Sequence, residues 1–389
     1  MNQTKPLLFA SEEMHRYSLG PGHPMGPDRV AAALSLAKHF GVLEEFDIEC
    51  PAPLNTSHLE LVHSPDYIAA TRAEVPSAHF GLGTEDNPIS HGLSTIAARI
   101  AGGTLAAARA VWEGRAQRAV NLSGGLHHAF ADSMSGFCMY NDAAIAIRWL
   151  KANGAQRVVY LDLDAHHGDG VEKIFWNDPN VLTISVHESG LYLFPGTGYA
   201  HEIGGQGAEG TAVNVALPRG VSDEEWLQVI HAVVPPLLKK FRPDFIISQH
   251  GADPHRSDPL ADLELTIDAM ARAYRSVAVW AKQFAGGRWV ALGGGGYHVD
   301  AVARAWTQVL AAVADVELAA SERMPNGWEA RPPWVMRVRA PPLGVSIPPR
   351  SWLKSRTQRW CRLRAQSFPV GACRLMARPR IGGASTMRA

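Results

Sequence analysis

The sequence predicts a three-layer α/β protein in which helices cover both faces of a central, mainly parallel sheet. A chain of 389 residues with 46% hydrophobic content can bury a core of that size. From about residue 95 to 318, apolar β-rich runs alternate with amphipathic helical stretches, which is the pattern of a parallel sheet buried on both faces. Titratable side chains directly follow several of these runs, where open α/β sheets place their ligand sites.

Five apolar runs are the expected strands, and stretches between them are expected helices. Residues 267–284 place apolar side chains three and four apart, as one buried helical face requires. Ser222 and Glu225 have the spacing of a capping box that opens a second helix. Gly102 and Gly103 lie inside a third helical pattern, where each costs roughly 1 kcal/mol relative to alanine, so we expect close packing there. The expected strands are residues 118–122, 157–163, 181–187, 244–249 and 289–292.

The composition changes near residue 318, and we predict a domain boundary there. Residues 1–318 form the α/β domain, whereas residues 319–389 form a proline-rich, basic appendage. Residues 330–389 contain 13 Lys or Arg and no acidic residue, which leaves 24 basic and 37 acidic residues in the remainder. Such an appendage can contact the acidic domain or an anionic partner. Contact with nucleic acid is therefore expected only through this segment.

The sequence predicts a cytoplasmic protein without a membrane partner. Its apolar stretches fall well short of the ~20 residues that a membrane span needs. The apolar run near the N-terminus covers only residues 7–10, so no signal peptide is expected. The four cysteines lie far apart without CxxC spacing, which argues against a disulfide framework and against a zinc knuckle.

The most informative segment is residues 161–170, where titratable side chains directly follow an apolar strand. Burying them for stability alone would be costly. Asp164 and His166 are two residues apart, so both can point the same way and offer ligands to one divalent ion. Asp253 follows another strand and adds a second carboxylate. Three protein ligands are the set of a catalytic zinc, which keeps a position open for water or substrate.

Two further strands end in residues that suit acid/base chemistry. His127 and His128 are adjacent imidazoles that could act as base and acid on a bound water, and Asp162 and Asp169 are available to orient them. Four glycines precede Tyr297, and glycines permit close approach of the backbone to a ligand. A phenol there could donate a hydrogen bond to an oxyanion. A phosphate loop is the alternative for the glycine run, but the expected Lys-Ser or Lys-Thr is missing.

Six ordered motifs resemble those of the histone deacetylase superfamily, and within it those of the bacterial acetoin-utilisation deacetylases. The resemblance covers about residues 10–318 and implies an arginase/deacetylase-like α/β fold. The motifs are GHPMGPDR at 22–29, GLHH at 125–128, SGFCMYND at 135–142, DLDAHHGDG at 162–170, FPGTG at 194–198 and GGGGY at 293–297.

The resemblance implies the same metal ligands and the same histidine pair as the residues themselves suggest, with zinc as the ion and ferrous iron as the alternative. It also implies that Asp162 supports His127, that Asp169 supports His128 and that Tyr297 polarises the acetyl carbonyl. Either histidine could take the proton from water. The zinc ligands by this reading are Asp164, His166 and Asp253.

Further residues acquire implied roles around the metal. Asp86 matches a rim carboxylate that binds the substrate backbone, and Arg29 matches an arginine near the acetate exit path. The implied walls of a narrow acyl-lysine tunnel are Gly136, Phe137, Phe194 and Leu260. A structural monovalent cation, usually potassium, is implied on the main-chain carbonyls of Asp162, Asp164 and His166 together with Ser185 and Val186.

The expected activity is zinc-dependent removal of acetyl groups from protein lysine side chains, with acetyl-CoA synthetase as one candidate partner and an acetylated polyamine as the alternative substrate. Three departures from the family pattern bear on substrate choice: Leu193, Glu188 and His298.

Two rival classes are open to a chain with this fold. A two-manganese ureohydrolase would need further carboxylates where Gly168 and His255 stand. A non-catalytic acyl-lysine binder would be expected to lack a proton-transfer residue, and this chain keeps the full set.

Overall fold

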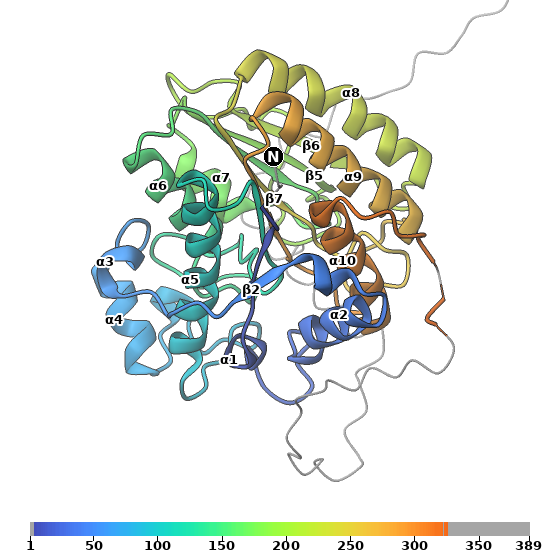
Figure 1. Cartoon of the computed structure of the whole chain (residues 1–389). Helices are drawn as coiled ribbons and strands as arrows, with labels where there is room; N and C mark the ends of the chain where they lie inside the picture. Colours follow the sequence, from blue (N-terminus) through green and yellow to red (C-terminus); the bar gives the residue numbers. More distant parts are fainter. Residues whose placement is uncertain (1–3, 322, 326–389) are drawn as a thin grey trace, which may run out of the picture.

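The structure, a computed structural model, describes residues 4–321 and 323–325, and these residues form one sheet of eight strands (Figure 1). The strand order is β2-β1-β3-β8-β7-β4-β5-β6, and every neighbouring pair is parallel. The predicted fold class is therefore confirmed. The strands are β1 (Leu7–Phe9), β2 (Asp47–Glu49), β3 (Arg118–Asn121), β4 (Val158–Asp162), β5 (Val181–Glu188), β6 (Ala212–Leu217), β7 (Phe245–Gln249) and β8 (Trp289–Leu292).

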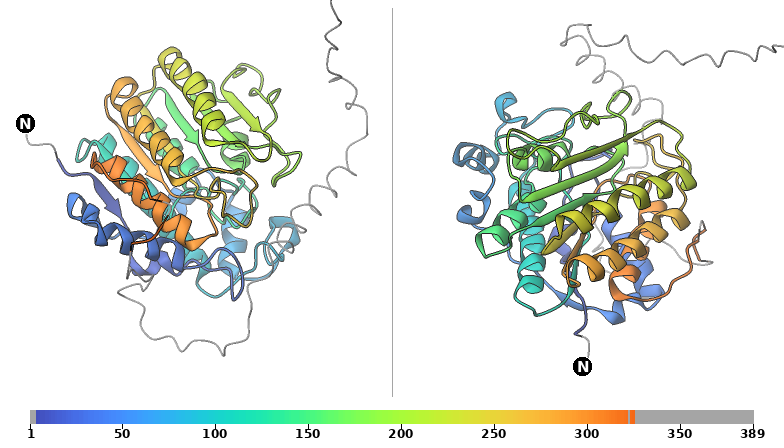
Figure 2. Two further views of the ribbon diagram at one scale, coloured as in Figure 1. Left: turned by 90° about the vertical axis from the view of Figure 1, so that its right-hand side faces the viewer. Right: turned by 90° about the horizontal axis from the view of Figure 1, so that it is seen from above.

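Helices cover both faces of this sheet (Figure 2). Helices α2, α8, α9 and α10 share a hydrophobic core with Val159 and Leu161 of β4, whereas α5, α6 and α7 pack against Val158 and Tyr160 of the same strand. Successive side chains of a strand point to opposite faces, so one buried strand supplies both cores. The helices are α1 (Glu12–His15), α2 (Asp28–His39), α3 (Thr56–Leu59), α4 (Pro65–Ala73), α5 (Leu93–Trp112), α6 (Asp142–Ala152), α7 (Asp169–Phe175), α8 (Asp223–Phe241), α9 (Ile267–Phe284) and α10 (Val299–Ala314), with 3₁₀ turns η1 (Val42–Glu45) and η2 (Ala78–Phe80).

The five predicted strands are present, each to within one residue at either end, but three strands were missed. β1 and β2 are three residues long, which is too short for a periodic signal, and Ile48 in β2 is 55% exposed. β6 lies at the opposite edge of the sheet and mixes buried with half-buried residues. Edge strands therefore lack the continuous apolar run that marked the central ones.

The three helix predictions are also confirmed. Helix α9 spans residues 267–284, and Ser222 with Glu225 forms a capping box at the start of α8. The paired glycines lie within α5, where a Cβ added to Gly102 would overlap the carbonyl oxygen of Ala52. A Cβ on Gly103 would come 2.9 Å from Nδ2 of Asn121. The backbone of α5 thus approaches its neighbours more closely than any residue with a side chain would allow.

The strands that end in the candidate site motifs are neighbours at the centre of the sheet. In the order β3-β8-β7-β4 they are hydrogen-bonded to one another along the sheet. Because parallel strands end at the same edge of a sheet, four loops that are distant in sequence meet there.

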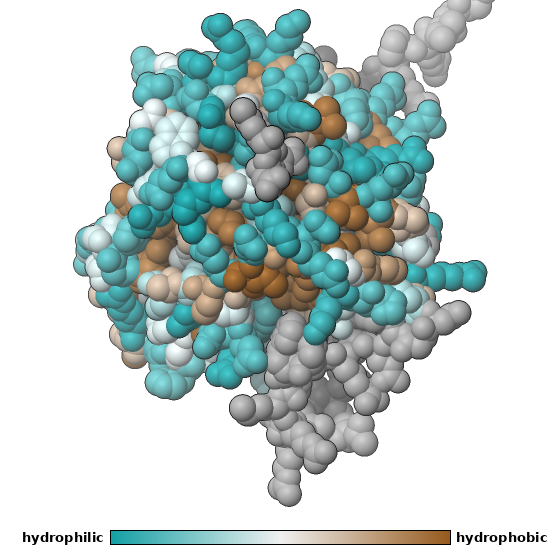
Figure 3. All heavy atoms as spheres, viewed as in Figure 1, coloured by the Kyte–Doolittle hydropathy of each residue, from teal (hydrophilic) through white to brown (hydrophobic). Residues whose placement is uncertain are grey.

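The face of the molecule shown in Figure 3 carries mostly hydrophilic residues, with smaller apolar areas between them. Within the described residues, no helix combines the length and the apolar character needed to cross a membrane. Cys50 and Cys138 are free cysteines. The predicted appendage lies largely outside the described residues, so the boundary near residue 318 stays a prediction.

Candidate active site

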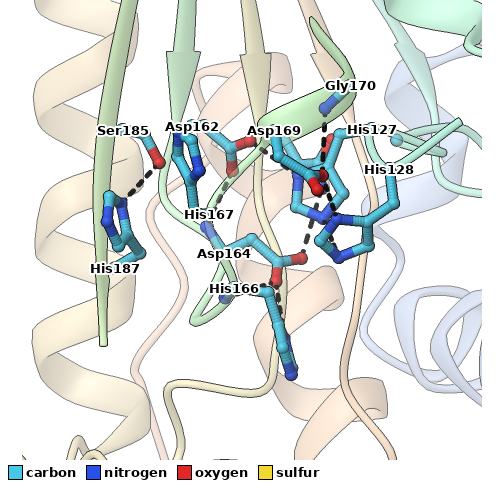
Figure 4. Close-up of polar contacts among 12 residues, drawn as sticks. His127, His128, Asp162, Asp164, His166, His167, Asp169, Gly170, Ser185 and His187 are labelled. Atoms are coloured by element: carbon cyan, nitrogen blue, oxygen red, sulfur yellow. Dashed lines mark hydrogen bonds and ion pairs between the residues drawn. The ribbon is translucent and has the colours of Figure 1, made fainter. Parts of the chain in front are cut away.

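The loops that follow β3, β4, β7 and β8 bring the predicted ligands and the histidine pair to one place. Figure 4 shows Asp164 and His166 beside His127 and His128. His166 Nδ1 lies 3.2 Å from Asp164 Oδ1 and 2.9 Å from Asp253 Oδ2. The side chains of both aspartates are fully buried, and that of His166 is 9% exposed. Among the described residues, this is the one group of three or more His, Cys, Asp or Glu side chains whose ligand atoms all lie within 4.8 Å of one another.

The donor set and its electrostatics fit a divalent cation. Two carboxylate oxygens and one imidazole nitrogen are ligands that zinc and related ions accept. Burial and the nearby charge of Asp164 raise the pKa of Asp253 to about 6, because two buried carboxylates repel each other when both are ionised. A cation bound to both would remove this repulsion.

The glycine run before Tyr297 leaves room for these carboxylates. A Cβ on Gly295 would overlap Oδ2 of Asp253, and one on Gly294 would come 2.7 Å from Oδ2 of Asp164. Instead, the backbone N–H of Gly295 donates to Asp164 Oδ2 at 2.7 Å. The glycines were predicted to let the backbone approach a bound ligand; in the structure the backbone approaches the carboxylates of Asp164 and Asp253.

The histidine pair is held by two carboxylates. His127 Nδ1 donates to Asp162 Oδ2, and His128 Nδ1 donates to Asp169 Oδ1, both at 2.7 Å. The two Nε2 atoms lie 3.0 Å apart (Figure 4). Each carboxylate fixes the tautomer of its imidazole, which leaves Nε2 of a neutral His128 as an acceptor.

The two imidazoles differ electrostatically. Burial opposes the charged form of His127, but Asp162 and Asp164 outweigh burial and raise its pKa to about 9. Burial and the charge of His127 lower the pKa of His128 to about 4. The pair is thus arranged to carry one positive charge. His127 is protonated on both ring nitrogens, whereas His128 is neutral.

A pocket of about 540 Å³ reaches the site from outside, and it is lined by His128, His166 and Tyr297. The ring of Phe194 meets that of His128 edge to face at 4.9 Å, and the ring of Phe137 meets that of Tyr297 in the same way at 5.9 Å. Every residue predicted for the tunnel and its rim also lines this pocket, namely Asp86, Gly136, Phe137, Phe194 and Leu260.

Phe137 has an unusual backbone conformation, which is held by hydrogen bonds to residues far away in the sequence. Its φ is 70°, in the left-handed region that non-glycine residues adopt at a cost. The hydroxyl of Tyr17 donates to its carbonyl oxygen at 2.7 Å, and its N–H donates to Asn87 Oδ1 at 2.9 Å. The sequence reasoning missed both partners because they lie 120 and 50 residues away in the chain.

Asp258 is a third residue that the sequence reasoning missed. This buried carboxylate accepts the N–H of Tyr297 at 2.6 Å and the N–H of Leu260 at 2.9 Å. Burial and the charge of Asp253 raise its pKa to about 7. Asp258 thus holds the backbone of two pocket residues, and its position five residues after a predicted ligand was the available signal.

Arg29 lies beneath Tyr297, at the wall of a separate cavity of about 30 Å³. Its guanidinium carbon is 5.3 Å from the centre of the Tyr297 ring and 5.0 Å from that of Trp306. The guanidinium also donates to the carbonyl oxygens of Gly294 and Gly296. Arg29 therefore supports the glycine run from behind.

The predicted potassium site and the three departures from the family pattern also lie near the pocket. Asp162 of β4 pairs in register with Ser185 of β5, so these main chains lie side by side. His298 caps α10 by accepting the N–H of Ala301 at 3.3 Å. Leu193 and Glu188 are buried near the pocket loop and are absent from the pocket lining.

Fold and site together define a class of three-layer α/β hydrolases with a metal-ligand triad beside a histidine pair. A model of the histone deacetylase domain matches residues 23–313. The acetoin utilization protein AcuC of Bacillus subtilis (strain 168) is 38% identical over 339 residues, covering 85% of this chain and 86% of that protein. The AcuC protein of Staphylococcus xylosus is 34% identical over 80% of this chain and 83% of its own length.

Solved structures give the same result. A histone deacetylase homologue from Aquifex aeolicus matches with a TM-score of 0.74 and 32% identity, over 81% of this chain and 86% of that one. A homologue complexed with SAHA matches with the same TM-score and identity, over 82% and 86% of the two chains. The chain belongs to the histone deacetylase family, and it is a hydrolase with the deacetylase fold, as its motifs predicted.

Proposed function

We propose that this chain is a zinc-dependent amidohydrolase that removes acetyl groups from lysine side chains of proteins. The observation that carries the proposal is the meeting of three functions in one pocket: His166 from the ligand triad, His128 from the histidine pair and the phenol of Tyr297. The aromatic walls of the pocket suit the apolar stem of an acyl-lysine.

Asp164, His166 and Asp253 would hold the cation, with ferrous iron as the alternative to zinc. A divalent ion there would supply Lewis-acid polarisation of the amide carbonyl and a water of lowered pKa. The ligand types favour zinc or iron over magnesium or calcium, which prefer oxygen ligands alone. Potassium on the main chains of β4 and β5 would serve as a structural ion.

The residues of the chain would then divide the proton transfers. His128 lines the pocket and presents Nε2 as an acceptor, so it would take the proton of the attacking water. His127 does not line the pocket; its charge, 3.0 Å from His128 Nε2, would tune how readily His128 takes and releases that proton. The Tyr297 hydroxyl would donate to the carbonyl oxygen as negative charge builds there. Return of the proton from the pair to the lysine amine completes the reaction.

Other residues would position the substrate. Phe137 and Phe194 would exclude water from the acyl-lysine stem, and Asp86 would accept hydrogen bonds from the substrate backbone at the rim. Arg29, beside the small inner cavity, would attract the acetate product.

Two classes of acetylated substrate suit this pocket. The relatives are named for acetoin utilization, and the motif resemblance makes acetylated acetyl-CoA synthetase the first protein to test. An acetylated polyamine is the second candidate, because Glu85 and Asp86 both line the pocket and favour a cationic ligand.

The decisive experiment compares acetate release from an acetyl-lysine peptide and from N-acetylputrescine, with the metal content measured on the same sample. The proposal expects one divalent ion per chain, a higher kcat/KM on the peptide, and loss of both ion and activity in Asp253→Ala. Two ions per chain would favour the ureohydrolase reading. Full activity in Asp253→Ala with its ion retained would refute the ligand assignment.

A further inference from the structure

A buried carboxylate that takes no part in the proposed chemistry lies at the carboxyl end of β5. The side chain of Glu188 is 0% exposed. Its Oε2 accepts the N–H of Asp262 at 2.7 Å, and its Oε1 lies 3.4 Å from Nε of Arg219. A charge buried to this degree persists in proteins when it is paired. Arg219, whose side chain is 40% exposed, is a cation that provides such pairing.

Arg219 contacts two different loops beside the pocket. Its Nε also lies 3.2 Å from Oδ2 of Asp262, in the loop between β7 and α9. Its guanidinium carbon lies 4.8 Å from the centre of the Tyr192 ring, and Nη2 donates to the Tyr192 carbonyl oxygen at 3.4 Å, in the loop between β5 and β6. One planar guanidinium therefore joins an ion-pair partner on one loop to an aromatic ring on the other.

Each of these loops carries a wall of the pocket. Tyr192 precedes Phe194 by two residues, and Asp262 follows Leu260 by two residues. Phe194 and Leu260 both line the pocket. The backbone of the second loop is also held from the adjoining turn, where Gly220 N–H donates to the Asp262 carbonyl oxygen at 2.8 Å.

We propose that Arg219 is a positioning residue that fixes Phe194 and Leu260 relative to each other and thereby sets which acyl groups the pocket accepts. The inference rests on the proposed function, since acyl groups enter it as substrates. Without the guanidinium, the bridge from Asp262 to Tyr192 is lost, so the two loops are no longer held at a fixed separation and the pocket widens. Arg219 touches no residue of the ligand triad or the histidine pair, so the chemical step itself is preserved.

The test compares Arg219→Gln and Arg219→Lys with a matched control, Arg115→Gln. Arg115 forms a comparable ion pair with Glu49, at 2.8 Å, next to the sheet edge opposite β5 and β6. Kinetics are measured on acetyl-lysine and butyryl-lysine peptides, and hydrogen–deuterium exchange is followed in residues 189–198 and 258–263.

Arg219→Gln is expected to raise KM for the acetyl peptide several-fold while kcat changes less. Its preference for acetyl over butyryl should fall roughly tenfold, the scale at which a pocket discriminates small apolar groups. Exchange should quicken in both loops and nowhere else. Arg219→Lys, which keeps the charge, should recover part of the preference, and Arg115→Gln should match the wild type.

An unchanged acyl preference in Arg219→Gln, or the same change in Arg115→Gln, would overturn the inference. Equal exchange in the two loops of Arg219→Gln and the wild type would overturn it too, whatever the activity. Wild-type protein that releases acetate from neither peptide would instead count against the proposed function.

Discussion

Tyr297 shows how one reactive side chain depends on contacts that its own motif does not reveal. Its backbone N–H is held by Asp258, its ring meets Phe137 edge to face, and Arg29 lies beneath the ring. Burial and the charge of Asp253 raise the pKa of the phenol well above its usual range, so it is a hydrogen-bond donor at neutral pH. A donor held in this way needs no reorganisation when charge develops on the substrate.

Tyr297→Phe is therefore expected to lower kcat by about 10²- to 10³-fold, the loss that follows removal of one such donor. The ring, its packing and the metal ligands remain, so the metal content and the thermal midpoint should match the wild type. Kinetics on an acetyl-lysine peptide would measure the loss of rate. Elemental analysis and thermal denaturation of the same sample would measure the metal content and the thermal midpoint. A variant with wild-type kcat would remove Tyr297 from the proposed chemistry.

At the scale of elements, α5 shows where a glycine pair specifies packing. Alanine is the better helix former by roughly 1 kcal/mol, so Gly102→Ala would stabilise an isolated helix. In the folded protein its Cβ would overlap the backbone carbonyl of Ala52, which cannot rotate away. We expect Gly102→Ala to lower the free energy of unfolding by about 1–3 kcal/mol, the usual cost of overpacking.

Urea denaturation of Gly102→Ala beside Thr95→Ala would check this. Thr95 is an exposed position of the same helix, and its replacement should leave the midpoint unchanged or raise it. If Gly102→Ala were more stable than the wild type, α5 could not approach the carbonyl of Ala52 as closely as the structure shows.

The strands and the residues around the site show how much of the structure could be predicted from the sequence. The central strands were predictable because burial on both faces forces a continuous apolar run, and Asp164, His166 and Asp253 were predictable because they follow such runs. The edge strand β2 was not, since its residues are largely exposed. Neither Tyr17 nor Asn87 carries a local signal, because their role is created by folding against Phe137.

Several buried histidines are expected to weaken the fold in acid. Burial lowers the pKa of His63 from 6.5 to about 4, and His63 Nε2 must be unprotonated to accept the N–H of Asn141 at 3.0 Å. Burial also lowers the pKa of His187 and His250 to about 3. Above pH 6.5 these groups are neutral in both states and contribute nothing to the pH dependence.

As the pH falls from 6.5 towards 4, these histidines bind protons in the unfolded chain but not in the folded one, so their contribution lowers the stability. Each such histidine contributes a slope of up to about 1.4 kcal/mol per pH unit. His63→Gln should be less stable at pH 7 yet lose stability less steeply below pH 6.5. Urea midpoints at half-unit intervals would measure this, with the exposed His201→Gln as control. Parallel curves for His63→Gln and wild type would contradict the prediction.

Metal binding should also be visible in the stability of the whole molecule. Asp164 and Asp253 are fully buried carboxylates whose repulsion a cation would relieve. A ligand that binds only the folded state stabilises it, so removal of the ion with a chelator should lower the thermal midpoint, and zinc should restore it. In Asp253→Ala, neither chelator nor zinc should move the midpoint. A chelator response in that variant would locate the ion elsewhere.

The placement of β3, β8, β7 and β4 side by side has a consequence for where the sheet can loosen. Each of these strands has hydrogen-bonded partners on both sides, whereas β2 and β6 each have one. Transient fraying of the sheet therefore begins at its edge strands, β2 and β6. Both lie several strands away from β8, near the centre of the sheet. The strands that carry the metal ligands and the histidine pair each lie at least two positions from an edge strand, so loosened pairing at β2 or β6 leaves their own hydrogen bonds intact.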